Sequence, residues 1–225
     1  MRQSYFIIGT DTNVGKTYVA SALVQHFVQL GFKAVGMKPI ASGCELNEPS
    51  ELGTTGELLN EDVTALINAS NVKAPLNIVN PYHFAPAIAP HIAAQQVGVE
   101  INLDNIEAAY QQLSTLADVV IVEGAGGFLV PLNQTQTLAD LAVQLKLPII
   151  LVVGMKLGCI NHALLTVEAI KVRGLTLAGW VANQIDPEMP MFAENLASLK
   201  QRIVAPCLSV VRWQETAQFD IKKSY

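Results

Sequence analysis

The chain has 225 residues and a net charge of −5, and 51% of its residues are hydrophobic against 15% charged. This acidic balance argues against a nucleic-acid partner, which needs a basic face, and no apolar stretch approaches the roughly 20 residues that cross a bilayer, which argues against a membrane protein. Cys44, Cys159 and Cys207 are far apart and fit neither a disulfide framework nor a zinc site. We therefore expect a cytoplasmic protein with one sizeable core, and with apolar surface hidden in an oligomer.

The first expected element is a strand over residues 5–10, which leads into the loop GTDTNVGKT (9–17) and then a helix that Gly31 ends. A Gly-Lys-Thr that opens a helix presents backbone N–H groups and the positive end of the helix dipole to phosphates. Lys16 would reach the outer phosphates, and the Thr17 hydroxyl would bind Mg²⁺. The loop glycine is Gly9, one residue earlier than in the usual pattern, so a plain strand-to-helix turn is the alternative.

Apolar runs then alternate with helical patterns to the end of the chain. Strands are expected at 33–39, 118–124, 148–154, 175–183 and 207–211, and helices at 62–69, 103–116, 138–145, 160–172 and 192–202. Several strands are apolar throughout, as central parallel strands are. This pattern predicts a single α/β domain over residues 1–225, a doubly wound, mostly parallel sheet with helices on both faces, P-loop NTPase-like. Residues 42–61 are expected to form a mobile loop, and 80–91 a second irregular stretch.

Polar residues follow four of the expected strands. The first strand leads into the phosphate loop, and the others lead into Lys38, Glu123 and Asn183. Because ligands bind outside the carboxyl ends of parallel strands, we expect these groups to converge from four adjacent strand ends on one crevice. A carboxylate after four apolar residues needs a compensating cation, and Mg²⁺ is the usual one in nucleotide sites. The alternatives are a helix cap or salt bridge for Glu123, a surface lysine for Lys38 and, for Asp62, an acid favoured by a helix N-terminus.

Six motifs together resemble the dethiobiotin synthetase family. They are GTDTNVGKT (9–17), GMKPIASG (36–43), VNPYHFAPAIAPHIAA (79–94), VEGAGGFLVPL (122–132), LPIILVVGMKLGCINHALLT (147–166) and LTLAGWVAN (175–183). The resemblance implies ATP-driven conversion of 7,8-diaminopelargonate and CO₂ into dethiobiotin, a step of biotin biosynthesis, through a carbamate and a carbamic-phosphoric anhydride. It also implies ATP and Mg²⁺ as cofactors, and a homodimer.

The resemblance also implies roles for individual residues. The catalytic pair would be Lys16 and Lys38, which hold the carbamate and the transferring phosphate. The Mg²⁺ ligands would be Thr17, Asp62 and Glu123. The nucleotide would contact Asn13, Val14, Gly15, Lys16, Thr17, Tyr18, Asp62, Glu123, Gly124, Ala125, Gly126, Asn183 and Gln184, the last two at adenine. The substrate would contact Ser42 and, through its carboxylate, Gly158, Cys159, Ile160 and Asn161, the latter four from the partner subunit.

Two other functions fit the same fold. One is a partner-regulated ATPase switch of the chromosome-partitioning or septum-positioning type, which typically carries an extra lysine in a Lys-Gly-Gly pattern where this chain has Gly9-Thr10-Asp11. The other is a different amide-forming or ring-closing ligase, because fold alone does not set the reaction. The chain departs from the family near its end: Arg212 stands where a proline is familiar, and residues 214–225 match weakly. Selectivity for ATP over other triphosphates is therefore left open.

Overall fold

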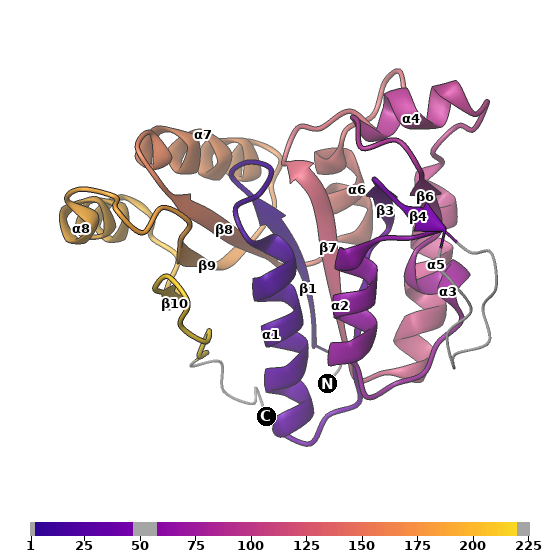
Figure 1. The fold of residues 1–225 in the computed structure, drawn as a ribbon, viewed down its shortest axis with the longest axis horizontal. Helices are drawn as coiled ribbons and strands as arrows, with labels where there is room; N and C mark the ends of the chain where they lie inside the picture. The colour runs from indigo at the N-terminus through magenta and orange to yellow at the C-terminus, as the bar shows by residue number, and fades with distance from the viewer. Residues whose placement is uncertain (1–2, 47–57, 220–225) are drawn as a thin grey trace.

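A six-stranded parallel sheet forms the centre of the molecule in this computed structural model, which describes residues 3–46 and 58–219 (Figure 1). The spatial order is β10-β9-β8-β1-β7-β2, so the first strand is central. The strands are β1 (Gln3–Gly9), β2 (Ala34–Met37), β7 (Val119–Gly127), β8 (Ile149–Met155), β9 (Leu177–Gln184) and β10 (Cys207–Val211). The parallel α/β sheet expected from the apolar runs is thereby confirmed.

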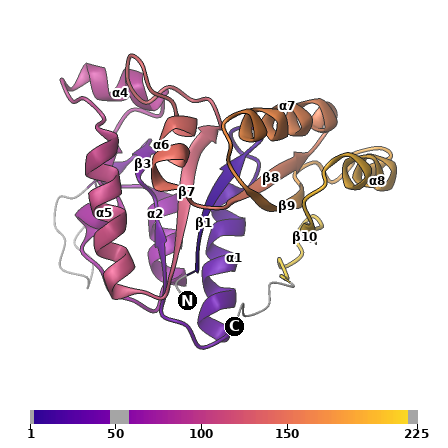
Figure 2. The ribbon, with the colours of Figure 1, turned by 180° about the vertical axis from the view of Figure 1, so that it is seen from behind.

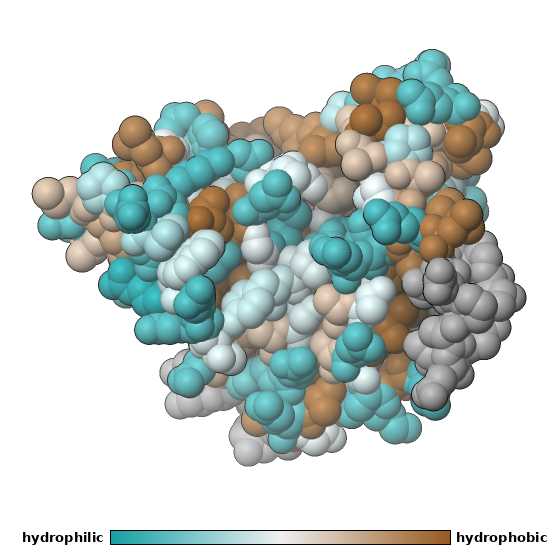
Figure 3. Space-filling model, in the orientation of Figure 1, coloured by the Kyte–Doolittle hydropathy of each residue, from teal (hydrophilic) through white to brown (hydrophobic). Residues whose placement is uncertain are grey.

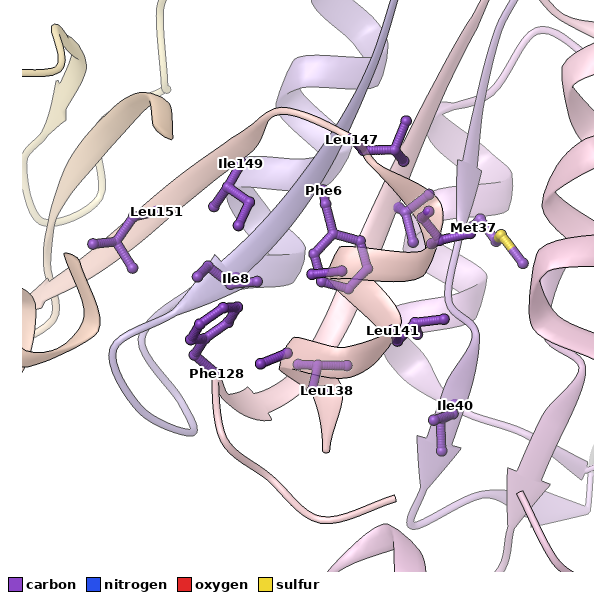
Figure 4. Close-up of a cluster of buried hydrophobic side chains, with 14 of the residues drawn as sticks. Phe6, Ile8, Met37, Ile40, Phe128, Leu138, Leu141, Leu147, Ile149 and Leu151 are labelled. Atoms are coloured by element: carbon purple, nitrogen blue, oxygen red, sulfur yellow. The ribbon is translucent and has the colours of Figure 1, made fainter. Parts of the chain in front are cut away.

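Helices cover both faces of this sheet, as Figures 1 and 2 show from opposite sides. Their bounds are α1 (Lys16–Gln29), α2 (Glu61–Ala69), α3 (Leu76–Val79), α4 (Pro90–Gln96), α5 (Leu103–Leu116), α6 (Leu138–Leu145), α7 (Cys159–Val172) and α8 (Phe192–Arg202). Alternate residues of β1 enter two separate cores, because side chains of a strand point to opposite faces. Ile7 packs with α1 and α2, whereas Phe6 and Ile8 pack with α5 and α6. Figure 4 shows Phe6 and Ile8 among Leu138 and other apolar side chains of this second core.

Two stretches expected to be irregular contain short regular elements. Within 80–91 the chain forms β6 (Tyr82–Phe84) and begins α4, and β6 pairs in parallel with β3 (Ile40–Ser42). Of 42–61, the two ends form β4 (Glu45–Leu46) and β5 (Leu58–Leu59), an antiparallel pair. Residues 47–57 lie outside the described residues, and so does most of the expected mobile loop. Pairing between β3 and β6 is long-range, which is why the local composition did not predict it.

Close packing of α2 on β2 brings Asp62 to the carboxyl edge of the sheet. Gly36 lies in β2 and faces Leu66 of α2; a Cβ atom at Gly36 would lie 2.7 Å from Leu66 Cβ. The absence of a side chain therefore lets the helix approach the strand. Asn60 caps α2, since its side chain accepts a hydrogen bond of 2.8 Å from the Asp62 N–H. Asp62 is consequently fixed one residue into the helix.

One expectation about the strand ends is wrong. The sequence placed the ends of four adjacent strands around one crevice, but β8 separates β9, which carries Asn183, from β1. Sheet order depends on contacts between distant residues, so the chain order of the strands did not reveal it.

Residues 3–46 and 58–219 contain no helix that is both long and apolar enough to span a membrane.

Candidate active site

Gly9 and Gly15 flank the loop between β1 and α1, and a side chain at either position would collide with neighbouring atoms. A Cβ atom at Gly9 would lie 2.7 Å from Val14 Cγ2, and one at Gly15 would collide with the Asn183 side-chain amide. Gly15 also has a φ of 86°, in the left-handed region that glycine adopts at little cost. Lys16 opens α1, is 7% exposed and donates a hydrogen bond of 2.8 Å from Nζ to the Asp11 carbonyl oxygen. The lysine side chain thus folds back over the loop.

Thr17, Lys38, Asp62 and Glu123 form one connected cluster beside this loop. Lys38 Nζ lies 2.5 Å from Glu123 Oε1 and 2.8 Å from Asp62 Oδ2. The Thr17 hydroxyl lies 2.6 Å from Asp62 Oδ1 and 2.7 Å from Glu123 Oε1. The four side chains come from α1, the end of β2, the start of α2 and β7. Residues up to 106 positions apart in the sequence therefore lie in contact. This agrees with the expectation that polar residues at the strand ends share one crevice.

Burial sets the electrostatics of this cluster. Glu123 is 0% exposed, and its Oε2 is buried without a hydrogen-bond partner among the described residues. Burial alone lowers the pKa of Lys38, but the Glu123 and Asp62 carboxylates outweigh it and hold that pKa above its ordinary value. Burial raises the pKa of Asp62, and the Lys38 charge outweighs it and leaves the pKa lowered. Lys38 and Asp62 therefore hold each other in their charged forms at neutral pH.

The pKa of Lys16 is lowered, in contrast to that of Lys38. Burial, followed by the nearby positive charge of Lys38, lowers its pKa from 10.5 to about 8. The Glu123 and Asp62 carboxylates only partly oppose this effect. A lysine whose charge is under-compensated in this way gains from an incoming anion, which supplies the missing negative charge.

Asn80 is a positioning residue that the sequence analysis missed. It is 0% exposed, and its Nδ2 donates hydrogen bonds to the carbonyl oxygens of Lys38, at 2.6 Å, and Tyr82, at 3.1 Å. The Lys38 N–H in turn donates to the Val79 carbonyl at 2.9 Å. The backbone of Lys38 is therefore held from both sides by residues 79–82. An Asn-Pro pair after an apolar run was the available signal, because buried amides are retained where they satisfy backbone groups.

The remaining candidate residues divide into two groups. Asn183 belongs with the loop, since its Nδ2 donates a hydrogen bond of 2.9 Å to the Val14 carbonyl. Gly124 also reaches the cluster, because its carbonyl lies 3.4 Å from Lys38 Nζ. Gln184 instead donates to the carbonyls of Asp186 and Pro187 at 3.2 and 3.3 Å. Its amide nitrogen therefore faces its own turn in this structure.

The two candidate substrate segments do not meet within the chain. Ser42 ends β3, and its hydroxyl is buried without a partner among the described residues. Gly158 to Asn161 form the start of α7, and β3 and α7 lie on opposite sides of β1 in both ribbon views (Figures 1 and 2). Cys159 is 1% exposed, and burial raises the pKa of its thiol in spite of the helix N-terminus. The structure thus supports packing, not nucleophilic chemistry, for that thiol.

Comparisons with known proteins agree with these motifs. The family AAA_26, described as an AAA domain, matches residues 3–219. A curated ATP-dependent dethiobiotin synthetase BioD from Aromatoleum aromaticum is 54% identical over 209 residues, which cover 93% of this chain and 90% of that protein. The proteins of the same name from Nitrosospira multiformis and Cellvibrio japonicus are 48% and 47% identical, over 96% and 100% of this chain and 90% and 95% of theirs.

Solved structures show a likeness of fold. The septum site-determining protein MinD complexed with Mg-ADP from Pyrococcus horikoshii matches with a TM-score of 0.53 at 15% identity, over 94% of this chain and 82% of that one. A ParA family ATPase from Chlorobium tepidum matches with a TM-score of 0.55 at 11% identity, over 96% and 86%. At such identities the likeness establishes a P-loop NTPase fold and nothing about the reaction.

Replacement of Lys38 by Met tests the charge balance of the cluster. The change leaves the buried Glu123 carboxylate without its cation, which should lower the free energy of unfolding by about 3–5 kcal/mol. Urea denaturation at pH 7 measures this value, and adding Glu123→Gln in the same chain should recover a large part of it. The control is Lys156→Met, because Lys156 and its partner Asp11 are 41% and 44% exposed and should contribute less than about 1 kcal/mol. Equal losses in both variants would contradict the prediction.

Proposed function

The chain belongs to the ATP-dependent dethiobiotin synthetase family, and from that premise we propose how its residues divide the work of making dethiobiotin. The reaction consumes ATP and closes the ureido ring of dethiobiotin from 7,8-diaminopelargonate and CO₂, in biotin biosynthesis. The observation that carries the proposal is the convergence of Thr17, Lys38, Asp62 and Glu123 beside the phosphate loop. This arrangement offers positive charge and oxygen ligands without a nucleophile, which suits phosphoryl transfer.

The chemical steps use the two substrate amines in turn. One amine adds to CO₂, gives up a proton to solvent and becomes a carbamate, and a carbamate oxygen attacks the γ-phosphorus of ATP while ADP leaves. The second amine then attacks the carbonyl carbon of the carbamic-phosphoric anhydride. It gives up a proton to solvent, and the C–O bond to phosphate breaks as the ring closes. Lys16 and Lys38 act throughout as electrostatic stabilisers of the transferring phosphate, and positioning supplies the remainder of the catalysis.

The oxygen ligands present fit Mg²⁺. The Thr17 hydroxyl lies within hydrogen-bond distance of one oxygen of Asp62 and one of Glu123, and Glu123 Oε2 has no hydrogen-bond partner among the described residues. Within the described part of the chain no group of three His, Cys, Asp or Glu residues could hold a metal. Two carboxylates and a hydroxyl can supply part of the oxygen coordination shell of Mg²⁺, with phosphates and water as the remaining ligands. When bound, the ion neutralises phosphate charge.

The nucleotide and substrate are assigned to the two sides of this cluster. Asn13 to Tyr18, with Gly124 to Gly126, would hold the phosphates, and Asn183 and Gln184 would contact the adenine. Ser42 would bind 7,8-diaminopelargonate, and its unpartnered buried hydroxyl is available for this role. Gly158 to Asn161 would receive the substrate carboxylate at the start of α7, where helix N–H groups favour an anion.

A homodimer would bring the two substrate segments together. Because β3 and α7 lie on opposite sides of β1 in one subunit, a partner subunit is a natural source of the carboxylate site. Large apolar side chains are exposed on and around α4 and α7, at 91% for Leu157, 63% for Leu165 and 43% for Ile92. Figure 3 shows brown surface along the upper rim, over these helices. Exposed apolar side chains of this kind support a subunit interface at this rim.

The reaction itself is tested by one incubation. Purified protein is mixed with MgATP, bicarbonate and 7,8-diaminopelargonate, and the product is measured by mass spectrometry and phosphate release. A ureido product, with phosphate release that depends on the diamine, is the expected result. Phosphate release that is equal without the diamine, with no new product, would favour an ATPase switch instead.

Replacement of Lys16 by Gln should cut turnover by at least ~10²-fold, the scale for loss of one electrostatic stabiliser of the transition state. The measurement is steady-state dethiobiotin formation at saturating MgATP. Lys200→Gln on the exposed face of α8 is the matched control and should keep its turnover. Near-normal turnover of the Lys16 variant would remove this residue from the catalytic role.

The lowered pKa of Lys16 predicts that MgATP binds less tightly as the pH rises above about 8. Below that value the free enzyme already carries the charge that phosphates need, whereas above it binding must take up a proton. Affinity should therefore fall by up to about tenfold per pH unit. Calorimetric titration between pH 7 and 9.5 measures it, and Lys16→Arg, which stays charged, should flatten the curve. A flat wild-type curve would contradict the prediction.

Replacement of Glu123 by Gln should raise the Mg²⁺ concentration needed for half-maximal activity, because a neutral amide is a poorer ligand for a hard cation than a carboxylate. Activity is titrated against Mg²⁺ at fixed ATP. Glu194→Gln, at an exposed position of α8, serves as the control. An unchanged Mg²⁺ dependence would place Glu123 outside the metal site.

A further inference from the structure

The phosphate loop contacts the segment that leads from β8 into α7. The Gly154 N–H, near the end of β8, donates a hydrogen bond of 3.4 Å to the Thr10 hydroxyl. A Cβ atom at Gly154 would lie 2.7 Å from Val14 Cγ1, so the absence of a side chain lets the two segments approach closely. Residues 10–14 and the residues that lead into α7 therefore share a packed contact.

Asp11 extends this contact through three of its oxygen atoms. Its Oδ2 forms an ion pair of 3.2 Å with Lys156 Nζ, and its Oδ1 accepts a hydrogen bond of 2.7 Å from the Thr12 N–H. Its carbonyl oxygen accepts the hydrogen bond of 2.8 Å from Lys16 Nζ. The Thr12 hydrogen bond is the largest cause that holds the pKa of Asp11 below its ordinary value, and Lys156 adds to it. Asp11 is thus a charged residue that contacts both lysines.

Lys156 in turn belongs to the start of α7. Its carbonyl oxygen accepts a hydrogen bond of 3.0 Å from the N–H of Cys159, the first residue of the helix. The backbone of Lys156 is therefore bound to the first turn of α7 while its side chain is bound to Asp11. Gly158 to Asn161 lie in this turn and are the residues proposed to receive the substrate carboxylate. The ion pair thus links the phosphate loop to the proposed carboxylate segment.

The charge of Asp11 is shared between the two lysines in this structure. It pairs with Lys156, and it also supports the charge of Lys16 against burial and the charge of Lys38, which lower the pKa of Lys16. Phosphates at the loop would supply Lys16 with negative charge of their own, so less of the Asp11 charge would be drawn to Lys16. The pairing of Asp11 with Lys156 would then strengthen and hold the start of α7 more firmly.

We propose that Lys156 is a positioning residue through which a nucleotide at the phosphate loop orders the start of α7 for the diamine carboxylate. The inference rests on the proposed function, which assigns phosphates to residues 13–18 and the carboxylate to residues 158–161. A segment that is already ordered spares the substrate the entropy of ordering it. MgADP therefore raises the affinity for 7,8-diaminopelargonate, and the diamine raises the affinity for MgADP by the same factor. This holds whichever subunit's diamine site the segment serves.

Calorimetric titration measures this coupling without product formation, because ADP has no γ-phosphate to transfer. We expect the Kd for 7,8-diaminopelargonate to be about two- to fivefold lower at saturating MgADP, the scale of one exposed ion pair. Lys156→Gln should abolish the difference, and Lys156→Arg, which keeps the charge, should retain it. Arg173→Gln is the matched control, because it removes a comparably exposed ion pair of 2.7 Å, with Asp140, at the other end of α7.

Hydrogen exchange provides a readout that needs no diamine. MgADP should slow exchange at residues 159–162 in the wild type and in Lys156→Arg, but not in Lys156→Gln. Exchange in the phosphate loop should slow in all three proteins, which shows that each of them still binds the nucleotide.

The outcomes separate this inference from the proposed reaction. Slower exchange at 159–162 that depends on Lys156, in a protein that does not bind the diamine, would support the coupling and overturn the substrate assignment. A diamine Kd and an exchange rate at 159–162 that MgADP leaves unchanged, or changes equally in the wild type and in Lys156→Gln, would overturn the coupling and leave the reaction intact. Loss of the coupling in Arg173→Gln as well would show a general effect of α7 stability and would overturn the positioning role of Lys156.

Discussion

A carboxylate buried at the end of a central strand is the constraint on which the rest of the structure depends. Glu123 is fully enclosed, and a charge in such a place is tolerated only when a cation compensates it. Lys38 provides the cation, which requires β2 to lie beside β7. Asp62 forms the second ion pair of Lys38, which requires α2 to lie close to β2 at Gly36. One buried charge thus fixes the relative positions of two strands and a helix.

The same charges serve stability and chemistry. In this structure the Lys38 ammonium contacts both carboxylates that the proposed Mg²⁺ site uses. A bound cation would share those carboxylates and leave more of the lysine charge for phosphate. Lys16 differs because its charge is opposed by burial and by Lys38 and is incompletely balanced. The charge of Lys38 is therefore paired with carboxylates of the protein, whereas the charge of Lys16 lacks a full counter-charge and would gain one from a bound anion. This difference suits a site for a highly charged nucleotide.

Local patterns in the sequence predicted a large part of this arrangement. The apolar run before Glu123 showed that its carboxylate would be buried, and Gly-Lys-Thr located the start of α1. Both signals lie within a few consecutive residues. The contact of Asn80 with Lys38, the pairing of β3 with β6 and the place of β8 between β1 and β9 join residues that are distant in the chain. Periodicity carries no information on such contacts, so the structure was needed to find them.

The central place of β1 has a consequence for synthesis of the chain. β1 pairs only with β7 and β8 in the described sheet, so no partner strand exists until Val119 and later residues have been made. At ribosomal rates of ~5–20 residues per second, the stretch between Gly9 and Val119 corresponds to roughly 5–20 s. During that time both edges of an apolar strand are unpaired, which is the condition that promotes aggregation. The strand that delivers the phosphate loop therefore waits longest for a partner among the strands of the described sheet, and chaperone binding would protect it during that time.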